Sequence, residues 1–229
     1  MIWVIIIGFM ILGWLVQYRL KSKFKRYSQM PIRSGLSGAE VVELMLRDNG
    51  IHDVRITCIP GKLTDHYNPT NKTINLSEAV YYGRNAAAAA VAAHETGHAV
   101  QHARAYAPLK LRSALVPIQN ASTKILNIIF MFSIIGAFFI GIFPREIAFL
   151  LIIACYAVFA LFSIVTLPVE FDASKRALAW IDQAGIVSSQ EHEASKDALK
   201  WAAMTYVVAA ISSIAMLLYY ISIFMGGRD

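Results

Sequence analysis

The chain has 229 residues, of which 21 are Lys or Arg and 15 are Asp or Glu, so its formal net charge at pH 7 is +6. Its composition is 57% hydrophobic and only 16% charged, against about 45–50% and 25% in an ordinary soluble domain. This composition excludes a disordered chain and argues against a soluble globular protein. With only two cysteines, a disulfide-stapled fold is excluded as well. A membrane-embedded protein with a modest polar domain remains.

Four stretches of the chain contain no charged residue, and each has about the 17–25 residues that a helix needs to cross a bilayer. These stretches are residues 2–18, 125–143, 147–169 and 201–225. We therefore predict a mainly α membrane protein with four transmembrane helices and a small α+β domain. The predicted boundaries are a transmembrane helix at 1–18, a polar segment at 19–120, a transmembrane hairpin at 121–169, a polar segment at 170–200 and a last transmembrane helix at 201–225.

Basic residues gather on one side of this arrangement. Five of them directly follow the first predicted crossing, at Arg19, Lys21, Lys23, Lys25 and Arg26. With four crossings, only Arg145 and Arg228 fall on the other side. The side that is rich in Lys and Arg normally faces the cytosol, so we expect both polar segments there. Topology and attraction to lipid headgroups thus explain the positive charge, and no motif supports nucleic-acid binding.

The first polar segment predicts a short helix followed by three strands. Ser37 and Glu40 form a capping-box pattern, and the helix that they start ends near Gly50. Short runs rich in strand-forming residues, separated by turns with Pro, Gly and Asn, then predict strands at 54–59, 63–67 and 72–77.

Further helices are predicted on both sides of the transmembrane hairpin. Asn85 is a good N-cap, and the alanine-rich run after it predicts a helix through His102. Residues 168–183 are expected to be helical up to Gly185. Ser188 opens a second capping-box pattern, and the helix that it starts is expected to run without a break into the last crossing.

The sequence His94-Glu95-Thr96-Gly97-His98 matches the pattern H-E-x-x-H within a predicted helix. Residues four apart lie on one helix face, so both imidazoles can bind one zinc ion. Glu95 then lies beside the open position of the metal, where it can take a proton from a water molecule and pass it to the leaving amine. The alternative is a chance match on an amphipathic helix, but the alanine-rich helix and the upstream strands agree with the metal site.

A catalytic zinc site needs a third protein ligand. His102 continues the row of His94 and His98, but on an unbroken helix it lies about 12 Å from His94, so it cannot bind the same ion. Glu170 is the better candidate, because the predicted hairpin returns the chain to the side of the two histidines. The alternative for Glu170 is an exposed acidic residue at the start of a helix.

Three segments of the chain resemble the YugP-like family of membrane-bound zinc peptidases, distant relatives of gluzincin membrane proteases such as the heat-shock protease HtpX and the prenyl-protein endopeptidases. They are DHYNPTNKTINLS at 65–77, AVAAHETGHAVQH at 90–102 and PVEFDAS at 168–174. The resemblance covers nearly the whole chain. It implies a small cytosolic gluzincin-like metalloprotease domain, with one zinc ion per chain held by His94, His98 and Glu170 and with Glu95 as the catalytic base.

The sequence departs from the wider gluzincin pattern after the third ligand. Those proteases often carry an Asp four residues after the ligand Glu, whereas this chain has Ser174 there and its acid at Asp172. Helix geometry favours Ser174 as the partner of the ligand histidines, but we favour Asp172 because a carboxylate is the stronger acceptor for an imidazole N–H.

The resemblance also suggests that the edge of a strand holds the substrate peptide. The residues of this edge are Thr64, Asp65, His66 and Tyr67.

These observations together predict a zinc-dependent endopeptidase embedded in the bacterial inner membrane, with its active site facing the cytosol. Its expected partners are membrane lipid and membrane-associated protein or peptide substrates. The alternative is a non-catalytic membrane scaffold or adaptor stapled by the metal, in which Glu95 has no role. An intramembrane-cleaving protease and a transporter fit less well, because no crossing carries the H-E-x-x-H motif or paired ionisable residues.

Overall fold

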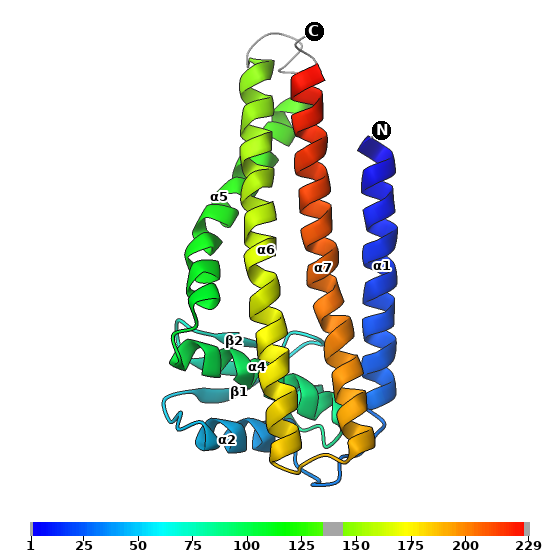
Figure 1. The fold of residues 1–229 in the computed structure, drawn as a ribbon, viewed down its shortest axis with the longest axis vertical. Helices are drawn as coiled ribbons and strands as arrows, with labels where there is room; N and C mark the ends of the chain where they lie inside the picture. Colours follow the sequence, from blue (N-terminus) through cyan, green and yellow to red (C-terminus); the bar gives the residue numbers. More distant parts are fainter. Residues whose placement is uncertain (1, 135–143, 227–229) are drawn as a thin grey trace. The chain divides into compact units, whose positions relative to one another are not determined.

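The computed structural model describes residues 2–134 and 144–226 (Figure 1). Its elements in chain order are α1 (Ile2–Tyr27), α2 (Gly38–Asp48), β1 (Arg55–Ile59), β2 (His66–Asn68), β3 (Thr73–Ser77), α3 (Glu78–Tyr81), α4 (Ala86–Ala103), α5 (Ala107–Ile134), α6 (Arg145–Gln183) and α7 (Ser189–Gly226).

Four of the described helices are long and apolar enough to cross a membrane, namely α1, α5, α6 and α7. This finding confirms the predicted number of crossings and the mainly α fold with a small sheet. The helices extend beyond the apolar stretches, and α6 continues through Pro168 into the second polar segment. The predicted second crossing at 125–143 lies partly outside the described residues, as do Arg228 and the side chain of Arg145.

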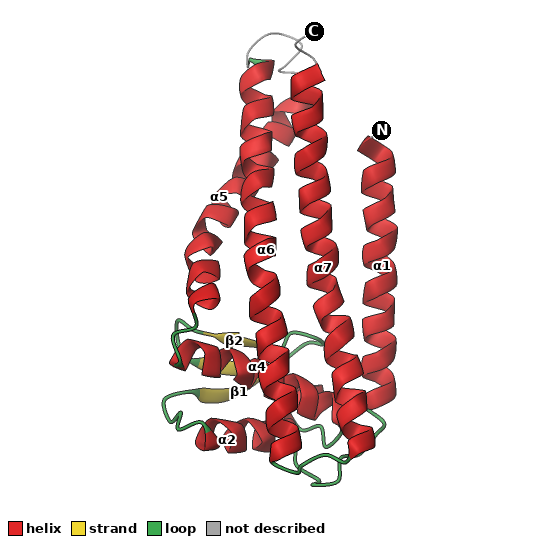
Figure 2. Ribbon diagram, viewed as in Figure 1, coloured by secondary structure: helices red, strands yellow, loops and turns green. Residues whose placement is uncertain are grey.

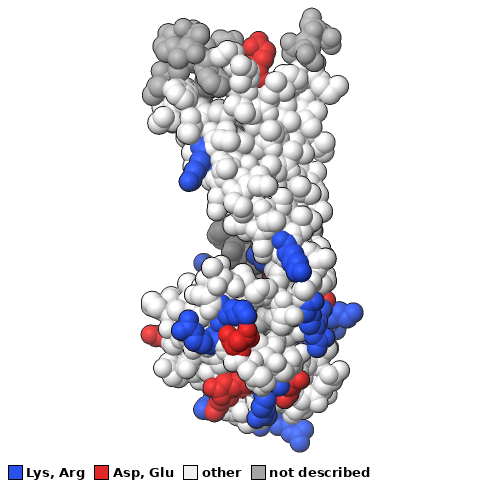
Figure 3. All heavy atoms as spheres, turned by 90° about the vertical axis from the view of Figure 1, so that its left-hand side faces the viewer, with Lys and Arg blue, Asp and Glu red and all other residues white. Residues whose placement is uncertain are grey.

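The chain divides into two compact units. The first, called the membrane unit below, comprises residues 1–14, 111–167 and 206–229. The second, the polar unit, comprises residues 15–110 and 168–205. On the face drawn in Figure 3, charged side chains gather over the polar unit, whereas the helices of the membrane unit carry few of them.

The polar unit contains a small sheet, drawn in yellow in Figure 2. It has three strands in the order β1-β3-β2. β1 pairs in parallel with β3, and β2 pairs antiparallel with β3, so β2 is an edge strand. The three predicted strands are thus confirmed, but β2 does not begin at residue 63. Leu63 has a φ of 58°, a left-handed conformation that an extended strand does not contain. Thr64 and Asp65 therefore belong to the loop before β2.

The local signals that predicted the helices are present in the structure. The Ser37 N–H donates to Glu40 Oε2 over 2.6 Å, and the Glu40 N–H donates to Ser37 Oγ over 3.3 Å. Ser188 and Glu191 form the same pair of bonds at the start of α7. Asn85 Oδ1 accepts from the Ala88 N–H over 3.0 Å, so the predicted N-cap of α4 is confirmed as well.

Small side chains allow α4 to lie in the middle of the polar unit. The alanines of its first half are almost completely buried in a core with residues of α2, β3, α6 and α7. Gly97 lies so close to α6 that a Cβ atom added to it would be 2.7 Å from the backbone oxygen of Ala173. Because this distance is far below a normal contact, the approach of the two helices requires glycine at position 97.

We predict that Gly97→Ala destabilises the protein by about 1–3 kcal/mol, the usual cost of overpacking, because the added methyl group forces α4 and α6 apart. The measurement is chemical unfolding of the purified protein in detergent. Gly13→Ala is the matched control, since Gly13 is also helical and an added Cβ meets nothing within 4 Å. Equal stability of the Gly97 variant and the wild type would contradict the close approach of the two helices.

Candidate metal centre

Three potential metal ligands converge where α4 packs against α6. His94 and His98 lie one turn apart on α4, and Glu170 comes from α6. The Nε2 atoms of His94 and His98 lie 3.3 Å and 3.6 Å from Glu170 Oε2. One donor atom from each of the three residues can be chosen so that all lie within 4.8 Å of one another. Two residues from one helix and one from a distant helix thus form a single cluster.

The donor set of this cluster fits zinc. Two imidazole nitrogens and one carboxylate oxygen are the protein ligands of one type of catalytic zinc site, which keeps the fourth position open. Ligands bound tetrahedrally at about 2.0–2.1 Å from zinc lie about 3.3 Å apart. The observed separations of 3.3 Å and 3.6 Å are close to that value, so little movement is needed for the three side chains to hold the ion.

The electrostatics of the cluster keep its carboxylate ionised. Burial by itself raises the pKa of Glu170, but the attraction of the adjacent His94 and His98 imidazoles has the larger combined effect and holds the pKa well below its usual range. For His98, burial by itself lowers the pKa, and the contacts with Glu170 reverse this effect and raise it. The Glu170 side chain is therefore charged at neutral pH, as a metal ligand must be.

A buried glutamine orients His98. Gln101 Nε2 donates to the Val169 carbonyl oxygen and to Asp172 Oδ2, each over 2.8 Å. Both partners are acceptors, so the amide oxygen of Gln101 must face His98 Nδ1, which lies 3.0 Å from it. His98 Nδ1 therefore carries the proton, and the lone pair on Nε2 is available to a metal.

The structure places Ser174 and Asp172 differently around the two imidazoles. Ser174 Oγ lies 3.1 Å from His94 Nδ1, as helix geometry suggested. Asp172 reaches His98 only through Gln101, and it also accepts from Arg176 Nε over 2.6 Å. Partial burial raises the pKa of Asp172, but the hydrogen bonds from Arg176 and Gln101 more than offset this and lower it. Sequence reasoning overlooked Gln101, although its position three residues after His98 on the same helix is a signal.

Glu95 lies between the ligand histidines and the edge strand. Its side chain is buried, and Oε2 accepts from the Tyr67 backbone N–H of β2 over 2.9 Å. The hydroxyl group of Tyr67 lies 2.7 Å from His102 Nδ1.

Of the four residues of the predicted substrate edge, His66 and Tyr67 are in β2. Asp65 lies in the preceding loop and accepts hydrogen bonds from the backbone N–H and the hydroxyl group of Ser77.

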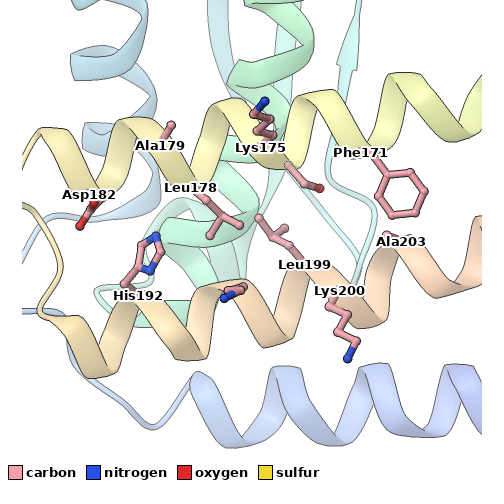
Figure 4. Close-up of a pocket in the computed structure, with 11 residues that line it drawn as sticks. Phe171, Lys175, Leu178, Ala179, Asp182, His192, Leu199, Lys200 and Ala203 are labelled. Atoms are coloured by element: carbon pink, nitrogen blue, oxygen red, sulfur yellow. The ribbon is translucent and has the colours of Figure 1, made fainter.

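A groove of about 560 Å³ lies between α6 and α7 next to the metal ligands. Figure 4 shows Leu178, His192 and Leu199 pointing into the space between the two helices, whereas Lys175 and Lys200 point away from it. Ser174 also lines this groove, so one residue contacts both the groove and His94. His192 lies in the groove and is not part of the ligand cluster.

Comparison with known proteins agrees with this geometry. Residues 2–225 match the model of a family described as "Putative neutral zinc metallopeptidase". The chain is also 40% identical over 218 residues to a protein of Bacillus subtilis (strain 168) named "Putative membrane protease YugP", which covers 95% of this chain and 94% of the relative. No solved structure matches. These matches confirm the predicted family resemblance, and together with the four apolar helices they indicate an integral membrane protein. The chain belongs to this family of zinc metallopeptidases.

Proposed function

We propose that the protein is a membrane-embedded zinc endopeptidase that hydrolyses peptide bonds at the cytosolic face of the membrane. The observation that carries this proposal is the position of Glu95. Its carboxylate belongs to the same helix as two of the ligands and is held by the backbone of an edge strand. A metal that only stabilises the fold has no need of such a carboxylate, whereas peptide hydrolysis requires a base beside the open position.

In this proposal, His94, His98 and Glu170 hold one zinc ion per chain. Zinc supplies a Lewis acid that lowers the pKa of a water molecule and polarises the peptide carbonyl. Glu95 takes a proton from the attacking water with the oxygen that Tyr67 does not occupy, and it then delivers that proton to the leaving amine. Gln101 holds the His98 ring in orientation, and Ser174 does the same for His94.

The open edge of β2 is a suitable place for an extended substrate peptide. In an antiparallel strand, the N–H and C=O of one residue point to the same side, and those of the next residue point to the other. Because the Tyr67 N–H is directed at Glu95, the Tyr67 carbonyl also points away from β3. We propose that this carbonyl accepts a hydrogen bond from the substrate backbone, which brings the peptide beside Glu95.

We propose that the polar unit faces the cytosol, and that in bacteria the membrane is the inner one. The support comes from the charge distribution, since nearly all basic residues belong to segments on one side of the crossings.

We predict that Glu95→Gln retains about one zinc ion per chain but loses peptide hydrolysis, because the amide keeps the shape of the carboxylate and cannot accept the proton. Zinc content is measured by elemental mass spectrometry, and cleavage is measured with a peptide library and mass spectrometry. His98→Ala is expected to lose both zinc and activity.

Glu43→Gln is the matched control, because Glu43 is exposed on α2 and the substitution is identical. Its zinc content and activity should equal those of the wild type. Full hydrolysis by Glu95→Gln would refute the assigned base. The metal would then be better explained as a structural metal in a scaffold protein.

The orientation can be tested with reporters fused after Arg26 and after Gly185, which follow the apolar parts of α1 and α6. Both fusions should give the signal of a cytosolic reporter, such as fluorescence of a green fluorescent protein, because the segments belong to the same polar unit. Activity of an alkaline phosphatase fused at either position would mean that the polar unit faces the other side of the membrane.

Docking on β2 can be tested by methylating the backbone nitrogens of a cleaved peptide one at a time. If the peptide pairs with the strand, methylation of one nitrogen, the one that donates to the Tyr67 carbonyl, should raise KM by about 3- to 10-fold, because Tyr67 is the residue of β2 whose carbonyl points away from β3. The neighbouring nitrogens of the peptide are the internal control. A uniform effect along the peptide, or none, would show that the substrate is not held as a strand.

A further inference from the structure

The strand that holds Glu95 is a short edge strand. β2 contains three residues and, among the described residues, pairs with β3 alone. Short edge strands are weakly held, because their backbone has hydrogen-bond partners along one side alone. The position of the Tyr67 N–H, and with it the position of the Glu95 carboxylate, therefore depends on what else fixes β2.

The side chain of Tyr67 supplies a second attachment to the same helix. Its hydroxyl group lies 2.7 Å from His102 Nδ1, and the two ring centres are 5.8 Å apart. Glu95 and His102 are seven residues apart on α4, which is two turns or about 10 Å along the helix axis. The backbone and the side chain of a single residue thus contact α4 at two points.

We propose that Tyr67 and His102 form a clamp that fixes β2 to α4 and thereby positions the Glu95 carboxylate. The proposal rests on the proposed peptidase function, in which Glu95 is the base. His102 acts through Tyr67 and is a positioning residue. The clamp gives a role to the histidine that continues the row of His94 and His98 but lies too far along the helix to bind the same metal.

In the clamp, the phenol is the donor and the imidazole is the acceptor. Burial of the phenol, together with the nearby Asp53 carboxylate, raises the pKa of Tyr67 to about 12, so the phenol is protonated at neutral pH and has a proton to donate. The proposal places this proton on the contact with His102 Nδ1 and the imidazole proton on Nε2. Because Nδ1 must only accept a hydrogen bond, another acceptor at the same place can replace it.

The surroundings allow the contact to be removed without collapse of the core. Tyr67 and His102 border a cavity of about 350 Å³, which is also lined by Asp53 and Lys72. Asp53 and Lys72 form an ion pair with each other across the loops next to the clamp. Both Tyr67 and His102 are only partly buried, so substitutions that keep their size are compatible with folding.

The test measures the steady-state kinetics of Tyr67→Phe, His102→Leu, the double variant and His102→Asn in the full-length, zinc-loaded protein. Tyr67→Phe and His102→Leu should each lower kcat by about 10- to 100-fold, with a smaller change in KM and unchanged zinc content, because the base is misplaced. The double variant should lose no more than either single variant, since all three lack the same hydrogen bond. His102→Asn should keep most of kcat, because its side-chain oxygen can accept from Tyr67.

Hydrogen–deuterium exchange of residues 64–70 in detergent provides a readout that needs no catalysis. Exchange should be faster in Tyr67→Phe and His102→Leu than in the wild type and in His102→Asn. His52→Leu removes an exposed histidine that does not line the cavity beside the clamp, so as the control it should change neither exchange nor kcat. If the wild type cleaves no peptide, the proposed function fails, and unchanged exchange in the variants would then refute the clamp separately.

Two results would overturn the proposal in an active enzyme. The first is a kcat near that of the wild type in Tyr67→Phe and His102→Leu, which would show that Glu95 does not depend on the clamp even if β2 exchanges faster. The second is a fold-decrease in the kcat of the double variant that equals the product of the decreases in the two single variants. This would show that the two residues act independently.

Discussion

The contact between the backbones of α4 and α6 at Gly97 and Ala173 is the constraint on which the rest of the site depends. α4 supplies two imidazoles and α6 supplies the carboxylate, and the hydrogen bonds that connect the two helices join residues 68 to 80 positions apart in the chain. Since Gly97 has no side chain, the helices can approach closely enough for Glu170 to reach both histidines. The second variable position of the H-E-x-x-H motif thus has a structural task of its own.

Around this contact, each ligand histidine is oriented by a different kind of group. His94 contacts a hydroxyl group of α6, whereas His98 contacts the side chain of Gln101 on its own helix. Gln101 in turn binds the α6 backbone and Asp172, so the hydrogen bonds that orient His98 also attach α4 to α6. Orientation of the ligands and packing of the helices are therefore coupled, and a substitution that loosens one is expected to loosen the other.

The sequence contains strong local signals for the helices and for the ligand pair on α4. Capping boxes at Ser37 and Ser188, the N-cap at Asn85 and the four-residue spacing of His94 and His98 are properties of neighbouring residues, which explains why they are readable without a structure. Glu170 could be proposed because a third ligand was required and the hairpin returns the chain to the same side.

The remaining features depend on contacts between distant segments. The extent of β2 could not be read from the sequence, because the left-handed conformation of Leu63 and the hydrogen bonds that Asp65 accepts from Ser77 are set by the fold. Asp172 was favoured as the partner of an imidazole from its chemistry alone, but the intervening Gln101 is visible only when α4 and α6 are placed together. The pairing of Tyr67 with His102 is of the same kind, since 35 positions separate the two residues.

The most direct test of this account is the position of zinc in crystals of the zinc-loaded protein, measured by anomalous scattering at the zinc absorption edge. The account predicts one peak per chain, about 2.0–2.2 Å from the Nε2 atoms of His94 and His98 and from a carboxylate oxygen of Glu170. A peak bound by other residues, or one that Glu170 does not reach, would contradict it.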